Sequence, residues 1–460
     1  MTDLVTRSGS AVPGAAIDSF AAGLAGQVIR PGDAGYDSAR RIWNAAIDRH
    51  PGLIARCVGV ADVIAAVKFA RANDLVVAVR SGGHNVAGRA LCDGGLVIDL
   101  SAMRGVLVDP EQRVVRVQAG ARLGDLDRET HLHGLAVPCG IVSRTGIAGL
   151  TLGGGVGWLV RKYGLSCDNV IAFELVTAEG ELLTVSADDH PDLFWALRGG
   201  GGNFGIVTAF LFRAHPVTTV LGGLIVQPRD RARELLRLYR DVLPDAPESL
   251  GAVALLMTTP DGMPAAGIVA CWSGGMEEGE RVLKPLREFG PPLLDTVQEI
   301  PFPAMQAALD DAFPDGTHNY WKSTFVPDLD DAVIERIVDF AERMASPASA
   351  MVVEYYGGAP GRVGPGETAF AQRASEFNVA AIGQWADPAE TATHTAWARA
   401  AADAFRPFGR VGGLLNFTSD EPEDATALAF GANLARLSEI KRRYDPGNFF
   451  SLNVNVPVAA

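Results

Sequence analysis

Three glycine-rich segments in the first half of the chain each adjoin a run of strand-forming residues. They are RSGGHNVAG at 80–88, GIAGLTLGGGVGW at 146–158 and LRGGGGNFG at 197–205. Glycine tolerates positive φ and lacks a Cβ, so backbone N–H groups in such loops can approach an anion closely. One loop of this kind is typical of a tight turn. Three together indicate a cradle that holds a pyrophosphate with main-chain amides.

The pattern around these loops predicts a first lobe of mixed α/β structure. Strand-like runs such as LVVAVR at 75–80 and LVIDL at 96–100 alternate with a helical pattern at 61–74. A second helix is predicted from Leu123 to Gly134, because Leu123, Leu126 and Thr130 recur at helical spacing and glycine follows them.

The pattern changes between about Pro216 and Arg410, where glycine becomes rarer and helical stretches lengthen. This region predicts an antiparallel sheet with helices on one face. Beyond it, the helical pattern at 432–444 is stopped by DPGN, and FFSLNVNV at 449–456 predicts a final strand. The fold class is therefore α+β, divided at residues 1–215, 216–410 and 411–460.

Composition argues against several classes of protein. A net charge of −14 and a pI near 5.1 oppose binding to nucleic acid. No apolar run approaches the roughly 18 residues of a membrane span, and the opening residues lack a secretion signal, so we expect no membrane partner and a cytoplasmic location. The five cysteines are scattered without a CxxC pair, which argues against disulfides and structural zinc.

Two further patterns are rejected on their context. GGGNFG at 200–205 satisfies GxGxxG, but a Rossmann loop opens a helix, and here the strand-like IVTAFLF follows. His131 and His133 could face the same way, but no third ligand is visible, so they are interpreted as solvated residues at a helix end. No metal site is expected.

Long segments of the chain resemble the FAD-linked oxidases of the vanillyl-alcohol oxidase and p-cresol methylhydroxylase superfamily, in particular the berberine-bridge-enzyme-like branch. The resemblance lies in residues 80–88, 149–169, 192–208 and 441–455. It implies a two-lobed fold with an FAD-binding PCMH-type domain at 1–215 and a substrate-binding domain at 216–410. Residues 411–460 would form a berberine-bridge-like segment that returns to the flavin domain.

The resemblance implies that His84 is bonded covalently, through a ring nitrogen, to the 8α carbon of the flavin. A loop of small residues lets the imidazole reach the ring edge, and nitrogen is a suitable nucleophile for an electrophilic methyl group. Such a bond withdraws electron density and should make the flavin a stronger oxidant. Some relatives have a second link through a cysteine, where this chain has Val142; Cys139 lies three residues earlier, so no cysteinyl link is expected.

Other cofactor contacts follow from the same resemblance. Thr145 is expected beside the flavin ring, where it would shape the approach of oxygen, and Phe204 is expected near the adenine or ribose. For Arg80 a solvated charge at a strand end stays open as an alternative. The full set is Arg80, Ser81, Gly82, Gly83, Asn85, Gly88, Thr145, Gly146, Gly149, Gly153, Gly154, Gly155, Gly157, Asn203, Gly205, Val207, Asn453 and Asn455.

The candidate catalytic groups lie in the second half of the chain. Glu354 and Tyr356 are two residues apart, so on a strand both point to one face, where a carboxylate beside a phenol can accept a substrate proton. The alternative is a solvated glutamate paired with a surface arginine. Asn416 would present a polar group to the ring. Tyr320 and Trp321 would supply aromatic walls for the substrate, or pack in the core.

The sequence thus predicts an FAD-dependent oxidase acting on an aromatic, amine or polyketide-like metabolite, with O2 as the electron acceptor and H2O2 as the product. Three alternatives stay open: a flavin-dependent oxygenase or dehydrogenase of secondary metabolism, an oligosaccharide oxidase, and a flavin-binding module without turnover. The sequence does not indicate an oligomeric state.

Overall fold

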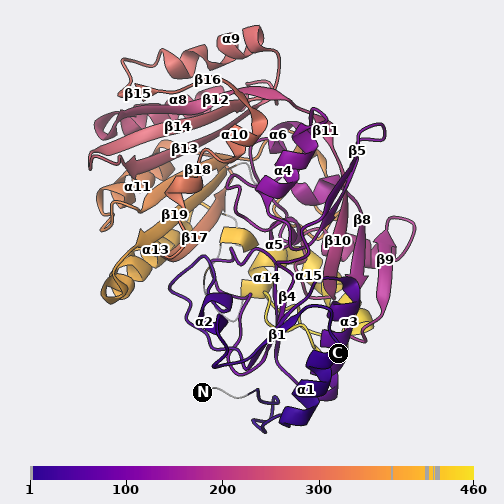
Figure 1. Cartoon of the computed structure of the whole chain (residues 1–460). Helices are drawn as coiled ribbons and strands as arrows, with labels where there is room; N and C mark the ends of the chain where they lie inside the picture. The colour runs from indigo at the N-terminus through magenta and orange to yellow at the C-terminus, as the bar shows by residue number, and fades with distance from the viewer. Residues whose placement is uncertain (1–3, 374–376, 410–413, 418, 420–424, 460) are drawn as a thin grey trace.

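The computed structural model describes residues 4–373, 377–409, 414–417, 419 and 425–459. They form two lobes, one built from the N-terminal half together with the C-terminal segment and the other from the middle of the chain (Figure 1). The predicted α+β architecture is confirmed, with a mixed first lobe and an antiparallel second lobe.

The first lobe contains two sheets. A four-stranded sheet has the order β1-β2-β4-β3, in which β2 and β3 run parallel to β4, and a five-stranded antiparallel sheet has the order β5-β6-β10-β8-β9. The bounds of these strands are β1 Gln27–Ile29, β2 Leu53–Arg56, β3 Val77–Arg80, β4 Leu96–Asp99, β5 Val106–Asp109, β6 Val114–Gln118, β8 Val170–Val176, β9 Leu182–Ser186 and β10 Ile206–Arg213.

Helices and a short strand pair complete the first lobe. Strands β7 (Leu135–Ala136) and β11 (His215–Pro216) pair antiparallel. The helices are α1 Gly14–Ala22, α2 Tyr36–Ala39, α3 Val60–Ala72, α4 Leu123–His131, α5 Ile147–Leu152, α6 Val160–Tyr163, α7 Pro191–Leu197, α14 Ala425–Phe430 and α15 Leu434–Tyr444.

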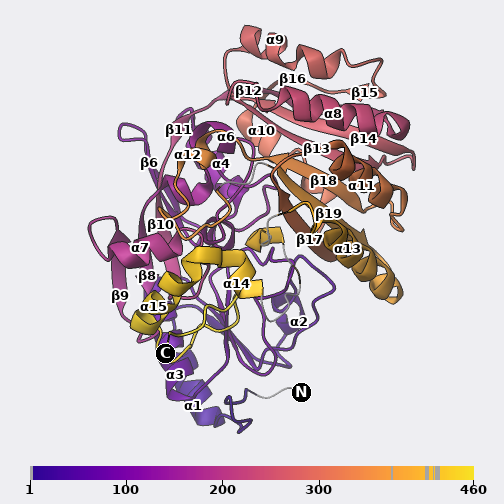
Figure 2. The same ribbon diagram turned by 180° about the vertical axis from the view of Figure 1, so that it is seen from behind.

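The second lobe is an eight-stranded antiparallel sheet with helices on its outer face (Figures 1 and 2). The strand order is β15-β12-β14-β13-β18-β19-β17, and β16 also pairs with β12. The strands are β12 Thr219–Pro228, β13 Leu250–Thr258, β14 Pro264–Trp272, β15 Leu294–Asp295, β16 Gln298–Pro301, β17 His318–Val326, β18 Ala350–Tyr355 and β19 Phe377–Trp385; the helices are α8 Ala232–Val242, α9 Met276–Arg287, α10 Phe302–Gln306, α11 Asp331–Glu342, α12 Ala359–Arg362 and α13 Thr391–Phe405.

Alternation along the central strands decides which side chains face the helices. On β13, Ala252, Ala254 and Leu256 join the core beneath α8, α11 and α13. The odd-numbered residues between them point to the opposite face, because successive side chains of a strand alternate. That inner face of the sheet looks toward the first lobe.

Two sequence expectations are wrong, one about the end of a helix and one about a strand. The helix that starts at Leu123 ends at His131, because the chain turns before Gly134, which takes a positive φ of 67°. The segment 449–456 forms no strand. Its amides bond to buried polar groups instead: those of Phe449 and Phe450 donate to the Asp445 carboxylate.

Each lobe has its own core. The core of the first lobe includes Phe430, Leu437 and Tyr444 from the C-terminal segment, so this segment is an integral part of the N-terminal lobe. In the part of the chain that the structure describes, no helix is both long and apolar enough to cross a bilayer.

Candidate active site

A cavity of about 960 Å³ lies between the glycine-rich loops of the first lobe and the inner face of the second-lobe sheet. All three predicted loops reach it, together with strands β13, β18 and β19. Ligand pockets usually measure about 300–1,000 Å³, so this cavity is at the upper end of the range and suits a large ligand with room for a second, smaller one.

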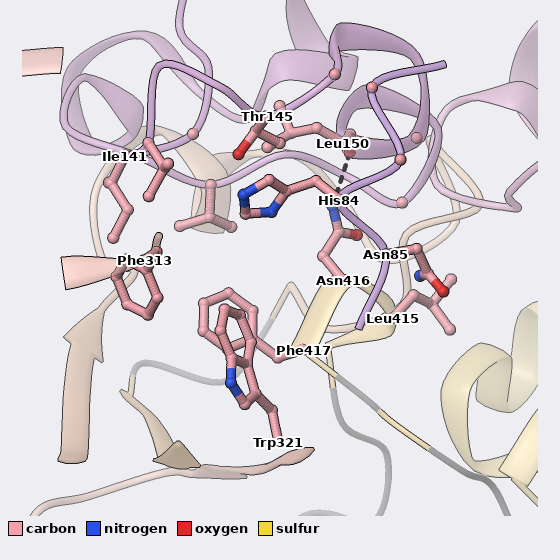
Figure 3. A pocket seen from close by; sticks show the side chains of 18 of the residues that line it. His84, Asn85, Ile141, Thr145, Leu150, Phe313, Trp321, Leu415, Asn416 and Phe417 are labelled. Atoms are coloured by element: carbon pink, nitrogen blue, oxygen red, sulfur yellow. Dashed lines mark hydrogen bonds between the residues drawn. The ribbon is translucent and has the colours of Figure 1, made fainter. Parts of the chain in front are cut away.

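His84 points into this cavity from the first loop (Figure 3). Its ring stacks on the Trp43 indole, with ring centroids 4.3 Å apart and planes inclined by 14°. The Nε2 atom is buried and has no hydrogen-bond partner among the described residues. Burial lowers the pKa of His84 to about 4, so the imidazole is neutral at pH 7 and keeps a nitrogen lone pair.

The first two glycine loops cross at Gly82 and Gly146. A Cβ on Gly82 would lie 2.5 Å from the Gly146 nitrogen, and a Cβ on Gly146 would lie 2.4 Å from the Gly82 nitrogen. Both glycines are therefore required by the close approach of two backbones. Gly149 differs from them, because it lines the cavity and a Cβ there would meet nothing within 4 Å.

The amides of the first loop are available to a ligand. Within the described parts of the chain, the N–H groups of Gly82, Gly83, His84 and Asn85 donate no hydrogen bond. Consecutive backbone N–H groups that border a cavity can bind an anion, so this row of four donors fits an anionic ligand. Free amides, the open face at Gly149 and the unpaired imidazole fit FAD, whose pyrophosphate needs donors and whose ring needs a flat surface.

The third glycine loop is fastened to the C-terminal segment. Asn203 is fully buried; its Nδ2 donates to the Val454 carbonyl at 3.0 Å and its Oδ1 accepts from the Val456 amide at 3.1 Å. Asn453 donates to the Gly202 carbonyl at 2.9 Å. Asn203 and Asn453 also line the cavity, so the same two side chains form part of its wall and hold the third glycine loop in position.

A buried lysine reinforces this junction. The Nζ of Lys441 donates to the Asn203 carbonyl at 2.7 Å and to the Phe450 carbonyl at 3.0 Å, and it pairs with Asp445 at 2.6 Å. Both side chains of the ion pair are at most 1% exposed. The role of Lys441 depends on contacts between distant segments, which the local sequence pattern does not indicate.

Glu354 lies deep in the cavity, on the inner face of β18, and is 4% exposed. The Tyr356 hydroxyl donates to its Oε2 at 2.6 Å, and Asn378 on β19 donates to the same oxygen at 2.9 Å. Burial raises the pKa of Glu354, and the two hydrogen bonds partly oppose that rise. Among the described residues the carboxylate has no cationic partner.

Asn378 is a site residue that the sequence did not reveal. It pairs across β18 and β19 with Glu354, so the register of the sheet brings the two side chains together. The FNVAAIGQW run reads as a buried strand, and its polar residue becomes informative only when the strand partner is known.

Further predicted residues surround the space in front of His84. Thr145 lies on the same side as the imidazole, and Trp321 faces it across the cavity (Figure 3). The Asn416 side chain donates to the Leu150 carbonyl at 3.1 Å. Its Oδ1 packs against Gly153, where an added Cβ would lie only 1.9 Å from that oxygen. Val142 lines the cavity, whereas Cys139 is buried and does not.

The assigned cofactor residues divide between the cavity wall and the layer behind it. The cavity is lined by Ser81, Gly82, Gly83, His84, Asn85, Thr145, Gly146, Gly149, Gly153, Asn203, Gly205, Val207 and Asn453. It is not lined by Arg80, Gly88, Gly154, Gly155, Gly157 or Asn455, nor are Tyr320 and Tyr356 among its lining residues.

Several of these second-layer residues have identifiable structural contacts. Arg80 is not solvated, since its guanidinium donates to the Ala39 carbonyl and burial lowers its pKa. Gly88 has a φ of 70° and would place a Cβ 2.6 Å from the Ile47 side chain. Tyr320 accepts a hydrogen bond from Arg399 at 2.8 Å.

The two histidines at the end of α4 differ in exposure. His133 is exposed, whereas His131 is half-buried, and its Nδ1 has no hydrogen-bond partner among the described residues.

Comparisons with known proteins agree with this geometry. Residues 51–186 match the family model of the FAD binding domain, and residues 414–457 match the model described as berberine and berberine like. The chain is 32% identical to an FAD-linked oxidoreductase of Dictyostelium discoideum, covering 96% of each chain, and 31% identical to (R)-6-hydroxynicotine oxidase of Paenarthrobacter nicotinovorans, covering 94% of this chain and 97% of the other.

Solved structures extend the similarity to the whole fold. The crystal structure of 6-hydroxy-D-nicotine oxidase from Arthrobacter nicotinovorans superposes with a TM-score of 0.86 at 31% identity, covering 94% of this chain and 98% of the other. A berberine-bridge-enzyme-like protein of Physcomitrella patens has a TM-score of 0.87 at 25% identity, covering 97% and 99%.

Fold and site together define an FAD-dependent oxidoreductase with a two-lobed architecture. The chain belongs to the berberine-bridge-enzyme-like family of FAD-linked oxidoreductases, as its sequence motifs indicated, and it is an oxidase of that family.

Proposed function

We propose that the protein oxidises a small molecule at a carbon that bears a hydroxyl or amine group, with Glu354 as the proton acceptor and O2 as the final electron acceptor. The observation that carries the proposal is the buried Glu354 carboxylate, which lines the cavity that also receives His84. FAD, when bound, supplies the two-electron acceptor for this oxidation.

Glu354 is suited to accept the substrate proton. Burial raises the pKa of Glu354 above that of an ordinary carboxylate, and a higher pKa makes the carboxylate a stronger base. Tyr356 and Asn378 both donate to Oε2, so they hold the carboxylate in place and leave Oε1 for the substrate. The substrate loses one proton to Glu354, and two electrons with the second hydrogen leave its carbon. O2 finally takes the two electrons and two protons to give H2O2.

The test of this role is Glu354→Gln, which keeps the shape of the side chain and removes the base. We expect kcat to fall by about 10²- to 10⁴-fold, the usual contribution of a general base. Bound flavin should be unchanged, measured by absorbance per mole of protein. A Gln variant that turns over like the wild-type enzyme, with substrate consumption and H2O2 both monitored, would refute the role.

We further propose that His84 bonds to the 8α carbon of FAD. Its neutral imidazole has an unpaired Nε2 and is stacked in place by Trp43. Such a bond would put a ring nitrogen in place of one hydrogen of the methyl group, with the release of two protons, and the two remaining electrons would pass to O2. Val142, at the place of the second tether in some relatives, offers no thiolate, so a single bond is expected.

Acid denaturation tests this bond. We expect the yellow colour to stay with the wild-type polypeptide and to be released from His84→Ala. A peptide map should find the flavin mass on the peptide that contains residue 84. Free flavin from the denatured wild-type protein, with this peptide unmodified, would show that FAD is held without a covalent bond.

The relatives leave one other chemistry to be tested. One relative, 36% identical over 42% of this chain, is named an FAD-dependent monooxygenase. We propose simple oxidation for this chain, so no ¹⁸O from labelled O2 should enter the product. Labelled product would assign oxygenase chemistry instead.

A further inference from the structure

The inner face of the second-lobe sheet forms a continuous apolar surface along the cavity. Its side chains are Val253, Leu255 and Met257 on β13, Val352 on β18 and Ile382 on β19, which we call the apolar strip. The register of the sheet makes these residues neighbours, because Leu255 on β13 pairs with Val352 on the antiparallel strand β18. Leu255, Met257 and Val352 are half-buried although they lie inside the sheet, because they border open space.

The side chains that line the cavity become more exposed to solvent from the Glu354 end of the strip toward its other end. Pro260, Pro347 and Ala348 line the cavity and are exposed to solvent, so the cavity opens at this end of the sheet. Glu354 lies at the opposite, buried end. From Ala350 to Glu354 is four residues of one strand, which at about 3.3 Å per residue is about 13 Å. The carboxylate thus lies at the bottom of a channel, well removed from its opening.

Aromatic side chains adjoin the strip: Trp321 on β17 pairs with Ile382 and therefore lies on the same inner face of the sheet. Ile141 and Phe313 lie to one side of the His84 ring and Trp321 lies across the cavity from it (Figure 3), and the Phe313 and Trp321 rings meet edge to face at 5.5 Å. Among the described residues that line this channel, the other carboxylate, Asp311, is exposed to solvent. Uncharged polar side chains also line the cavity, among them Thr258, Ser349 and Gln384, whereas the apolar strip itself offers no side chain that could replace the hydrogen bonds of a sugar to water.

We infer that the enzyme takes an elongated apolar substrate, which enters between Pro260 and Ala348, lies along the apolar strip and brings its reactive hydroxyl or amine to Glu354. This inference rests on the proposed role of Glu354 and adds the shape and polarity of the substrate. Burial of the long axis supplies the affinity, and the one polar group at the inner end supplies the orientation.

The test uses the flavin-loaded enzyme and a series of 4-alkylbenzyl alcohols, from methyl to heptyl. Binding is measured by equilibrium dialysis, which does not depend on turnover. We expect affinity to rise about 3- to 4-fold with each added CH2, the factor for burying one methylene, until the alkyl chain emerges at the opening. Affinity that stays flat or falls as the chain lengthens would overturn the inference.

Ala350, half-buried at the outer end of β18, allows a matched pair of variants. Ala350→Phe fills the channel and should abolish the gain from the longer alkyl chains, whereas Ala350→Ser should keep it. Equal gains in both variants would place the alkyl chain elsewhere and overturn the channel. If Ala350→Phe fails to fold, the wild-type series alone decides.

The same compounds separate this inference from the proposed function. Bleaching of the flavin under nitrogen reports oxidation, and dialysis reports the channel. A strong gain with chain length without bleaching by any member would contradict the proposed chemistry and leave the channel intact. Bleaching by the methyl compound, with no gain in affinity along the series, would support the proposed chemistry and contradict the channel.

Discussion

At the scale of single residues, the site depends on how Glu354 is surrounded. Alternation along a strand predicted that Glu354 and Tyr356 share a face, and the hydrogen bond between them agrees with that geometry. Asn378 escaped prediction because its partnership exists only across two strands of specific register. Periodicity within one segment therefore finds neighbours along the chain but not those contributed by another strand.

The pH dependence of the reaction should report these neighbours. A base must be deprotonated to accept a proton, so kcat/KM rises with pH through the pKa of Glu354, which lies above that of an ordinary glutamate. The Tyr356 hydrogen bond lowers this pKa. Tyr356→Phe removes it, so the rising limb of the pH profile should move to higher pH.

A remote tyrosine provides the control for this shift. Tyr444→Phe removes a hydroxyl that bonds to Asp192 in the first lobe and should leave the rising limb where it is in the wild-type enzyme. A limb that moves to lower pH in Tyr356→Phe would contradict the assignment of this limb to Glu354.

At the scale of elements, the glycine-rich loops serve two different needs. Their density in the sequence predicted loops that meet around a ligand, and all three do line one cavity. The sequence did not distinguish Gly82, which touches another backbone, from Gly149, which borders open space. That difference depends on which loop lies opposite, a contact between segments far apart in the chain.

Alanine substitutions should separate the two kinds of glycine. In Gly149→Ala the new methyl group meets no protein atom and lies within α5, so the apoprotein should keep or slightly raise its Tm, while the methyl enters the cofactor space and lowers the flavin content. In Gly82→Ala the methyl group meets the Gly146 backbone, so both Tm and flavin content should fall.

Calorimetry of the apoproteins and the flavin absorbance of the purified variants check these outcomes. A Gly149→Ala apoprotein much less stable than wild type would contradict the open space assigned to that position, and full flavin content in Gly82→Ala would contradict the loop crossing.

At the scale of the whole molecule, the C-terminal segment belongs to the first lobe although it follows the second in sequence. Phe430, Leu437 and Tyr444 join the core of the first lobe, and Asn453 donates to the Gly202 carbonyl. The predicted strand at 449–456 was wrong because buried polar groups, rather than a neighbouring strand, receive its amides. Alternating apolar residues alone do not distinguish these two situations.

Lys441 should therefore control both stability and cofactor binding. Lys441→Met leaves Asp445 buried without its counter-charge, so unfolding free energy should fall by about 3–5 kcal/mol. The Asn203 carbonyl also loses its donor, so flavin content should fall. On the same helix, Arg443→Met breaks an exposed pair with Asp192 and should cost less than about 1 kcal/mol.

Urea unfolding of both variants measures the difference. Equal losses of stability in Lys441→Met and Arg443→Met would show that the buried pair is no more important than a surface one.

The fastening of the third glycine loop to residues 453–456 also fixes an order of events during biosynthesis. A nascent chain lacks the groups that hold Asn203 and Gly202 until translation has passed Val456. Most of both lobes is therefore synthesised before the third glycine loop can be fastened, and we expect the cofactor to be captured only after residues 453–456 have been made.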